Sequence, residues 1–242
     1  MEPVISLVNL SKTIGKSKIL HNISLSITKG QVYGFLGPNG AGKTTTMKAI
    51  LGIIAPTSGH VEIFGSAPNH TKVQSRLGFM PENTYLYKYL TGDEFLAFNG
   101  GFYDLSKNKI DERKTWVLEK VGLEHVKNKR LNSYSKGMLQ RIGLAQSILH
   151  DPEIIFLDEP MSGLDPIGRK MVKDLMLELK NDGKTIFFNT HILSDVEAIC
   201  DSFGIICEGK LVADMKIEEL EFPLEDFFMK KIKENSTRNY IE

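Results

Sequence analysis

Cysteine is scarce in this chain, because only Cys200 and Cys207 occur among its 242 residues. No spacing typical of metal ligands surrounds either of them, so the cysteines indicate no metal site. We expect both to be buried as small apolar side chains, as in proteins of a reducing compartment. The fold therefore needs no disulfide.

Net charge and long apolar runs are also missing. Thirty basic and thirty acidic residues cancel, so no overall field favours nucleic acid or an anionic membrane surface as a partner. No run approaches the roughly eighteen consecutive apolar residues of a membrane-spanning helix. After an early Glu2, residues 4–10 alternate apolar and polar side chains, which predicts a strand and not a signal peptide.

The most informative stretch reads Gly-Pro-Asn-Gly-Ala-Gly-Lys-Thr, between a strand-like run at residues 31–36 and a helix-like run at residues 45–54. Its spacing is that of a phosphate-binding loop. Small residues let successive backbone N–H groups point at phosphate oxygens, and the helix directs the positive end of its dipole at the same anion. Lys43 is expected to reach the β- and γ-phosphates, and the Thr44 hydroxyl to bind magnesium. The predicted nucleotide-binding residues are Gly37, Pro38, Asn39, Gly40, Ala41, Gly42, Lys43, Thr44 and Thr45.

An apolar run between Pro152 and Pro160 ends in two acids, Asp158 and Glu159. A run this short and apolar predicts a strand buried on both faces of a parallel sheet, and such sheets bind ligands at the carboxyl ends of their strands. Asp158 is expected to hold magnesium, directly or through water, and Glu159 to polarise the water that attacks the γ-phosphate. The alternative is that both acids cap a loop, and the upstream phosphate loop argues against it.

Further motifs follow downstream in a characteristic order. Apolar residues at helical spacing predict helices at residues 93–103, 110–121 and 136–149. The last helix is preceded by Tyr-Ser-Lys-Gly-Met-Leu-Gln-Arg at residues 134–141, and Ser-Gly-Leu-Asp-Pro and Thr-His follow later. With the two motifs above, this series over residues 4–213 resembles the ATP-binding subunit of an ATP-binding cassette (ABC) transporter. The sequence Leu-Asp-Glu-Pro-Met-Ser-Gly-Leu-Asp-Pro at residues 157–166 resembles that of the bacterial ABC-2 exporter type in particular.

The resemblance implies that ATP and Mg²⁺ are bound between two cassettes arranged head to tail. One subunit supplies the phosphate loop with Lys43, the acid Glu159 and the switch histidine His191 as catalytic residues. The other supplies Ser135 and Gly137, which aim a hydroxyl group, backbone N–H groups and a helix N-terminus at the γ-phosphate. Alone, Ser135 would be an ordinary helix N-cap and His191 a structural histidine. The complete series favours the ligand roles.

Three positions depart from the commonest cassette pattern. Ile14 stands where many cassettes place an aromatic ring against adenine, which predicts looser base discrimination and not loss of binding. Glu82 replaces a glutamine that touches magnesium and couples the site to the transmembrane partner. A carboxylate also binds hard cations, so Glu82 joins Thr44 and Asp158 as a predicted metal residue. Lys136 replaces a glycine in the signature and adds a cation near the anion.

The resemblance implies an α/β fold, with a P-loop NTPase core of a mixed sheet flanked by helices, an antiparallel β layer and an inserted helical subdomain. We expect one ABC nucleotide-binding domain, because 242 residues with 41% hydrophobic content suffice for two lobes. Its expected parts are residues 1–84 and 152–222 as the ATP-binding core, 85–151 as the helical signature subdomain, and 223–242 as a C-terminal helix and tail. Its expected strands are residues 4–10, 19–27, 31–36 and 61–64 in the antiparallel layer, and 77–80, 154–157, 185–189 and 203–207 in the parallel sheet.

Two surface segments have predicted packing roles. The aromatic-rich residues 85–95 match the family groove that receives a helix of the membrane subunit, and aromatic residues are good anchors. The alternative is that these rings seal the joint between core and helical lobe. In the tail, Leu224, Phe227, Phe228 and Ile232 recur at helical spacing, which predicts a helix that packs on its own core.

We therefore expect an ATPase subunit that dimerises around ATP, as a homodimer or with a close relative. The family resemblance implies that it powers a separate transmembrane permease of the exporter type. It would lie at the cytoplasmic face of the cell membrane through that permease, without a nucleic-acid partner. One alternative is an ABC ATPase that acts on ribosomes or DNA, although such relatives carry two cassettes or a long coiled-coil insertion. Another is a regulatory cassette with weak hydrolysis, suggested by Ile14 and Glu82 and opposed by Glu159 and His191.

Overall fold

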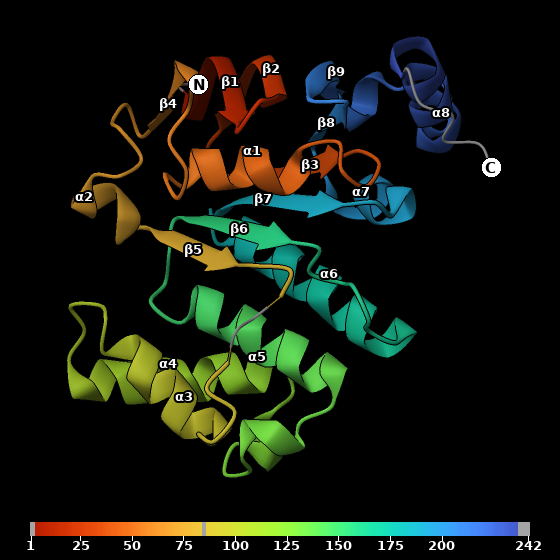
Figure 1. Ribbon diagram of the computed structural model, residues 1–242. Coiled ribbons are helices and arrows are strands. Elements are labelled where there is room, and N and C mark those ends of the chain that lie inside the picture. The colour runs from red at the N-terminus through yellow and green to blue at the C-terminus, as the bar shows by residue number, and fades with distance from the viewer. Residues whose placement is uncertain (1–2, 84–85, 237–242) are drawn as a thin grey trace. The chain divides into compact units, whose positions relative to one another are not determined.

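The computed structural model describes residues 3–83 and 86–236 (Figure 1). The chain forms two compact units, the first made of Met1–Gln74 with Thr185–Glu242 and the second of Ser75–Lys184. Each unit contains its own β-strands and helices. The division at residues 84/85 and 151/152 was predicted from functional motifs, and it stays a prediction.

The first unit contains an antiparallel sheet with strand order β2-β1-β4. Leu7 of β1 pairs with Leu25 on one side and Val61 on the other, and all three side chains are buried. The alternation of apolar and polar residues at the N-terminus thus forms one apolar face, as expected for a half-buried sheet. The strands are β1 (Pro3–Ile14), β2 (Ser17–Thr28) and β4 (Ser58–Ile63).

A second group of strands in the first unit is centred on β3 (Val32–Leu36), which lies between β7 (Thr185–Thr190) and β8 (Ser202–Cys207) and runs parallel to both. All five residues of β3 are buried. The prediction that residues 31–36 belong to the antiparallel layer is therefore wrong. This strand has no apolar–polar alternation because both of its faces are covered. β9 (Lys210–Lys216), which was not predicted, pairs antiparallel with β8.

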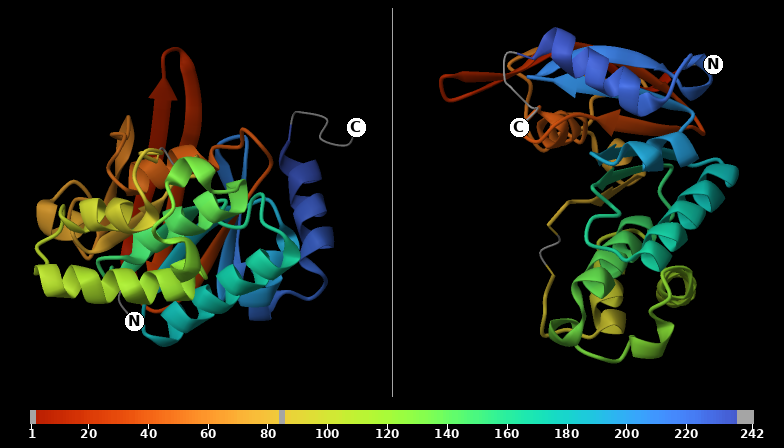
Figure 2. Two further views of the ribbon diagram at one scale, coloured as in Figure 1. Left: turned by 90° about the horizontal axis from the view of Figure 1, so that it is seen from below. Right: turned by 90° about the vertical axis from the view of Figure 1, so that its right-hand side faces the viewer.

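Helices complete the first unit. α1 begins two residues before the predicted start and ends at Ile50, because Gly52 adopts φ 71° just beyond the helix. The predicted C-terminal helix is present as α8, which lies beside β8 and β9 (Figure 2) and buries Leu224 and Ile232. The helices are α1 (Lys43–Ile50), α2 (Thr71–Gln74), α7 (Leu193–Ile199) and α8 (Leu224–Asn235).

The two cysteines differ in burial. Cys207 on β8 is buried, as predicted. Cys200 is only partly buried, so the prediction for it is wrong. The Sγ atom of Cys200 lies against Gly34 of the central strand β3. A Cβ atom added to Gly34 would lie only 2.9 Å from this sulfur.

The described residues of the second unit contain two parallel strands and four α-helices. β5 pairs with β6 so that Met80 lies opposite Leu157. The three predicted helices are confirmed as α3, α4 and α5, and side chains of Thr91, Ser106 and Ser135 cap their N-termini. The amphipathic α6, which begins after Asp165, was not predicted. The elements are β5 (Leu77–Met80), α3 (Gly92–Gly100), α4 (Lys107–Lys120), α5 (Lys136–Ile148), β6 (Ile154–Asp158) and α6 (Pro166–Asn181).

No helix within residues 3–83 and 86–236 is both long enough and apolar enough to cross a bilayer.

A buried histidine follows α5 in the second unit. The ring of His150 stacks on Tyr103, with centroids 3.7 Å apart and an interplanar angle of 6°. Its Nε2–H donates to the carbonyl oxygen of Leu77 at 3.0 Å, whereas the buried Nδ1 has no hydrogen-bond partner in the described part of the chain. Burial lowers the pKa of His150 from 6.5 to about 4, and the Leu77 hydrogen bond only partly offsets this.

This histidine should make stability depend on pH. Its folded-state pKa is depressed, so the unfolded chain takes up the proton first, and stability present above pH 6.5 is lost as the pH falls towards about 4. Between pH 7 and 5, we expect the free energy of unfolding to fall by roughly 2 kcal/mol more in the wild type than in His150→Phe. Urea unfolding across this range measures the difference. The exposed His125→Phe is the control, and parallel curves for the wild type and His150→Phe would contradict the assignment.

Candidate functional site

The predicted phosphate loop lies in the first unit, between β3 and the start of α1. Gly40 has φ 76° and Gly42 has φ 111°, conformations that favour glycine. Gly42 is the N-cap of α1, no side chain caps this helix, and its first turn contains no acid. The second unit differs, because its helices α3 and α5 are capped by hydroxyl groups. The loop and helix start thus suit an anion, since backbone N–H groups and the helix dipole are directed there.

Lys43 is buried at the start of α1, and its side chain reaches back to the first residues of the phosphate loop. It donates to the carbonyl oxygen of Gly37 at 2.6 Å and to that of Pro38 at 3.3 Å. Thr44 and Thr45 follow on the first turn, and both are partly buried. A cation and two hydroxyl-bearing residues therefore lie at the helix start next to the predicted phosphate loop, and these residue types fit a triphosphate with its magnesium ion.

The turn between β8 and β9 is hydrogen-bonded to the phosphate loop. The N–H of Gly209 donates to the carbonyl oxygen of Ala41, and the N–H of His21 donates to that of Gly209, both at 2.8 Å. Gly209 has φ 77°, and an added Cβ would lie 2.0 Å from the carbonyl oxygen of Ile19. Sequence reasoning missed this residue. The glycine between two apolar runs was the available signal, because glycine often marks a turn.

Ile14 lies at the end of β1 in the same unit, and 54% of its surface is exposed. The hairpin that carries it is anchored to the loop after α1. Lys12 Nζ donates to the carbonyl oxygen of Ala55 at 2.5 Å, and the N–H of Thr13 donates to Thr57 Oγ1 at 2.9 Å. Ile14 thus offers an aliphatic surface, and its contact with the base stays a prediction.

His191 leaves the same edge of the sheet as the phosphate loop. Leu36 of β3 pairs with Thr190 of β7, so the next residues of both strands, Gly37 and His191, emerge side by side. His191 is exposed. The strand register therefore explains how residues 154 positions apart, from 37 to 191, come together.

The second unit holds the acidic residues. Asp158 ends β6 and Glu159 follows it with φ 53°, and both side chains are buried. A positive φ is uncommon for a glutamate and is often found at functional sites. Gln140 of α5 donates through Nε2 to the carbonyl oxygens of Glu159, at 3.0 Å, and Pro160, at 3.4 Å. The helix after the signature motif thus fixes the backbone at the predicted catalytic acid.

Glu82 lies near the same strand ends as Asp158, because Met80 of β5 pairs with Leu157 of β6. Within the described residues, no group of three or more His, Cys, Asp and Glu side chains could hold a metal ion. Magnesium commonly uses one or two carboxylates together with water and substrate phosphates. The magnesium contact of Asp158 stays a prediction.

The signature residues begin α5. Ser135 is its N-cap, and its Oγ accepts a hydrogen bond from the N–H of Met138 at 3.2 Å. A Cβ added to Gly137 would lie 3.3 Å from Leu164 Cδ2. Ser135 thus has the structural role of an N-cap, and its contact with a nucleotide on another subunit stays a prediction.

The predicted site residues are divided between the two units. The phosphate loop, Ile14 and His191 belong to the first unit. Glu82, the Asp-Glu pair and the signature residues belong to the second.

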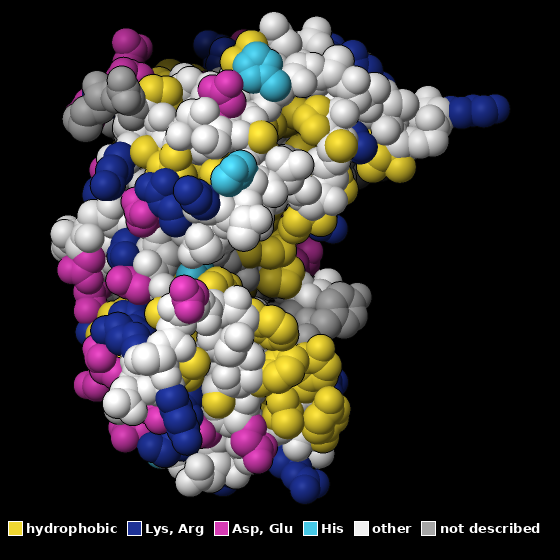
Figure 3. Space-filling view, turned by 90° about the vertical axis from the view of Figure 1, so that its left-hand side faces the viewer, with side chains coloured by type: hydrophobic (Ala, Val, Ile, Leu, Met, Phe, Trp, Pro, Cys, Tyr) yellow, Lys and Arg dark blue, Asp and Glu magenta, His cyan; other side chains and the backbone are white. Residues whose placement is uncertain are grey.

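An exposed aromatic cluster lies on the second unit, and Figure 3 shows hydrophobic side chains gathered in the lower right part of that view. Tyr87 contacts Tyr89 and Phe98, and Phe98 contacts Phe102, with ring centroids 5.0 to 6.0 Å apart. Tyr89 and Phe102 are the most exposed, at 67% and 72%. Phe95 is buried instead, so the described residues 86–95 include both packed and exposed aromatic side chains. Tyr85 lies outside the described residues.

The family is decided by comparison with known proteins. The ABC transporter family matches residues 20–162 of the chain. The chain belongs to this family. An ABC transporter ATP-binding protein of Nostoc sp., itself uncharacterised, is 48% identical over 203 residues, which cover 83% of this chain and 61% of that protein. The bacitracin transport ATP-binding protein BcrA of Bacillus licheniformis is 43% identical over 225 residues, which cover 91% of this chain and 72% of BcrA.

The fold is that of ABC ATPases. A solved ATP-binding subunit of an ABC transporter superposes with a TM-score of 0.88 at 28% identity, covering 94% of this chain and 99% of that chain. The predicted α/β class, with an antiparallel sheet and parallel strands flanked by helices, is confirmed. This chain spans 61% of the length of the Nostoc relative and 58% of that of a similar Synechocystis protein.

Proposed function

We propose that this ABC family member hydrolyses ATP to power transport through a separate permease. The buried Glu159 carries the proposal. It directly follows Asp158 at the end of β6, and the helix of the signature motif holds its backbone through Gln140. ABC ATP-binding cassette proteins are ATPases, and the relatives are named as transporter subunits. Release of inorganic phosphate from ATP by the purified chain, with and without magnesium, tests hydrolysis.

The chemistry divides among six side chains. Mg²⁺, when bound, supplies positive charge that neutralises the phosphate oxygens. Thr44 and Asp158 would hold it, with Glu82 as a further oxygen ligand. Lys43 stabilises charge on the β- and γ-phosphates, and Glu159 accepts a proton from the attacking water. His191 contacts the γ-phosphate from the neighbouring strand and orients that water.

The remaining contacts come from a second ABC subunit. Ser135 and Gly137 start α5, whose N-terminus and backbone N–H groups suit the γ-phosphate of a nucleotide bound by the other subunit. Two copies arranged head to tail then close two equivalent sites. A homodimer is the simplest assembly, because one chain carries both halves of the motif series.

Transport is favoured over ribosome, DNA or purely regulatory roles. The relatives are transporter ATP-binding proteins, and BcrA is named for bacitracin transport, which supports an exporter. A permease would then hold the chain at the inner face of the cell membrane. The exposed aromatic residues Tyr87, Tyr89, Phe98 and Phe102 are the proposed docking surface, since aromatic side chains anchor interfaces at low entropic cost.

The docking surface gives a prediction. The double variant Tyr89→Ser/Phe102→Ser should bind the permease at least about tenfold more weakly, because two anchor side chains are removed. Affinity is measured with the purified permease in detergent or nanodiscs. Met229→Ser, which alters an exposed apolar residue of α8, is the control. Equal affinities of the wild type and the double variant would exclude this surface.

A further inference from the structure

One side of the phosphate loop lies against the end of β8. A Cβ atom added to Gly37 would lie 2.4 Å from the carbonyl oxygen of Ile206, and one added to Gly42 would lie 3.2 Å from Ile206 Cδ1. Ile206 is fully buried. The glycines let the loop approach the strand this closely, because neither carries a side chain. The last residues of β8 thus form a wall beside the loop, and the turn to β9 follows directly.

This turn consists of Glu208 and Gly209, and it is held from two further sides. Both residues have positive φ, 44° and 77°, as in the two-residue turns that join neighbouring antiparallel strands. The N–H of His21 on β2 donates to the carbonyl oxygen of Gly209 at 2.8 Å, and β2 lies beside β9 (Figure 1). Ser236, just after α8, donates through Oγ to Glu208 Oε1 at 3.2 Å. The turn is therefore a fixed support next to the phosphate loop.

Gly209 sets the direction of one peptide group in that loop. Its N–H donates to the carbonyl oxygen of Ala41 at 2.8 Å. The peptide bond between Ala41 and Gly42 is trans and planar, so its N–H points away from its carbonyl oxygen. Because the carbonyl oxygen faces the turn, the N–H of Gly42 faces the opposite side of the loop. Gly42 is the N-cap of α1, so this N–H lies at the helix start, where an anion is favoured.

The position of Gly209 has no room for a side chain. Its φ of 77° is rarely adopted by L-residues, and an added Cβ would lie 2.0 Å from the carbonyl oxygen of Ile19 and 2.9 Å from His21 Cδ2. That carbonyl oxygen belongs to the backbone of β2, so it moves only if the strand or the turn moves. A side chain at Gly209 would therefore displace the turn from Ala41.

We propose that Gly209 is a positioning residue for nucleotide binding, whose N–H holds the Ala41–Gly42 peptide so that the Gly42 N–H is presented to phosphate. This inference rests on the proposed function, because it requires that the loop binds the phosphates of ATP. Gly209 itself does not contact the nucleotide in this role. Without its hydrogen bond, the peptide adopts other orientations, and nucleotide affinity falls with the fraction of loops in the competent one.

Replacing the Gly209 backbone N–H by an ester oxygen tests the hydrogen bond without adding a side chain. Cell-free translation with glycolic acid at position 209 makes this variant. Its dissociation constant for radiolabelled ADP with magnesium should rise about three- to tenfold over that of the wild type. ADP presents phosphates to the loop and has no γ-phosphate to hydrolyse. The same ester at Gly30 is the matched control, because it removes an N–H that donates to Thr185 Oγ1 at 2.9 Å in the same unit. It should bind ADP like the wild type.

Gly209→Ala is the second variant, and Gly59→Ala is its matched control. Gly59 on β4 has φ 78°, and an added Cβ would lie 2.3 Å from the carbonyl oxygen of Asn9, so both alanines introduce the same kind of strain. We expect both to lower the urea midpoint of unfolding, but only Gly209→Ala to weaken ADP binding, by at least about tenfold.

Unchanged ADP affinity of the Gly209 ester would overturn the proposal, and so would equal losses of affinity in the Gly30 or Gly59 controls. If Gly209→Ala does not fold, the two esters decide.

Failure of the proposed function is recognised separately, because the wild type would then bind neither ADP nor ATP. The positioning role is in that case judged by hydrogen exchange of the free chain. The reporter is the N–H of Ala41, which donates to the carbonyl oxygen of Pro38 at 3.1 Å. Faster exchange at Ala41 in the Gly209 variants but not in the controls supports the role, and unchanged exchange refutes it.

Discussion

Changing Glu159 to glutamine is expected to slow ATP turnover by about 10²- to 10⁴-fold while ATP binding persists. The amide keeps the shape of the side chain and its φ of 53°, but it cannot accept the proton of the attacking water. ATP then stays bound, so the two subunits remain associated. Phosphate release measures turnover, and gel filtration with ATP and magnesium should give twice the mass of a single chain.

The exposed Glu119→Gln provides the control for this change, since it alters the same functional group on the surface of α4. The Glu119→Gln variant should hydrolyse ATP at the wild-type rate, and its dimer should dissociate as the wild-type dimer does. A Glu159→Gln variant that keeps full turnover would remove Glu159 from the mechanism. One that stays monomeric with ATP would contradict the shared site.

Changing Gly42 to alanine is expected to weaken ATP binding by at least about a hundredfold, or close to 3 kcal/mol. The backbone at Gly42 has φ 111°, which L-residues rarely adopt. An added Cβ would also lie 2.8 Å from Leu20 Cδ2 and 3.2 Å from Ile206 Cδ1. The two side-chain ends can give way, but the strained φ is relieved only by a shift of the loop backbone, and its N–H groups then no longer converge on phosphate. Isothermal titration with ATP and magnesium measures the loss.

Gly30→Ala separates this effect from general strain. Gly30 also has a positive φ, of 80°, and no atom lies within 4 Å of an added Cβ. It should cost about 1 kcal/mol of stability and leave ATP affinity unchanged. Equal ATP affinity for Gly42→Ala and the wild type would show that this loop does not hold the phosphates.

The phosphate loop and the acidic strand end could be predicted because local chemistry defines them. Glycine spacing, Lys43 and the apolar run before Asp158 depend on neighbours in sequence, and the structure places them as a loop before α1 and the end of β6. The family resemblance was likewise confirmed. The predicted contacts of these residues with nucleotide and metal stay predictions.

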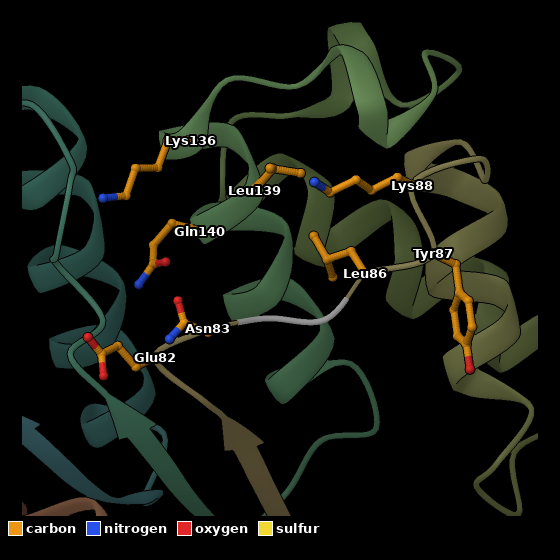
Figure 4. Close-up of a pocket in the computed structure, with 8 residues that line it drawn as sticks. All are labelled: Glu82, Asn83, Leu86, Tyr87, Lys88, Lys136, Leu139 and Gln140. Atoms are coloured by element: carbon orange, nitrogen blue, oxygen red, sulfur yellow. The ribbon is translucent and has the colours of Figure 1, made fainter.

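Long-range pairing limited the remaining predictions. Residues 31–36 were placed in the wrong sheet because an apolar run does not reveal its partners, and β3 pairs with strands from residue 185 onwards. Gly209 donates a hydrogen bond to Ala41 of the phosphate loop. Because the two residues are far apart in the sequence, only the fold shows this contact. The pocket that Glu82 and Lys136 both line (Figure 4) also depends on how β5 and α5 meet, which neither motif encodes locally.

In the proposed dimer, one ATP lies between the phosphate loop of one subunit and the signature residues of another. A structure of Glu159→Gln with ATP and magnesium tests this arrangement through the distance from Ser135 Oγ to the γ-phosphate. We expect two chains, with Ser135 of one within hydrogen-bond distance of the ATP held by Lys43 of the other. A single chain with bound ATP and Ser135 remote from every phosphate would show that the subunits do not share a site.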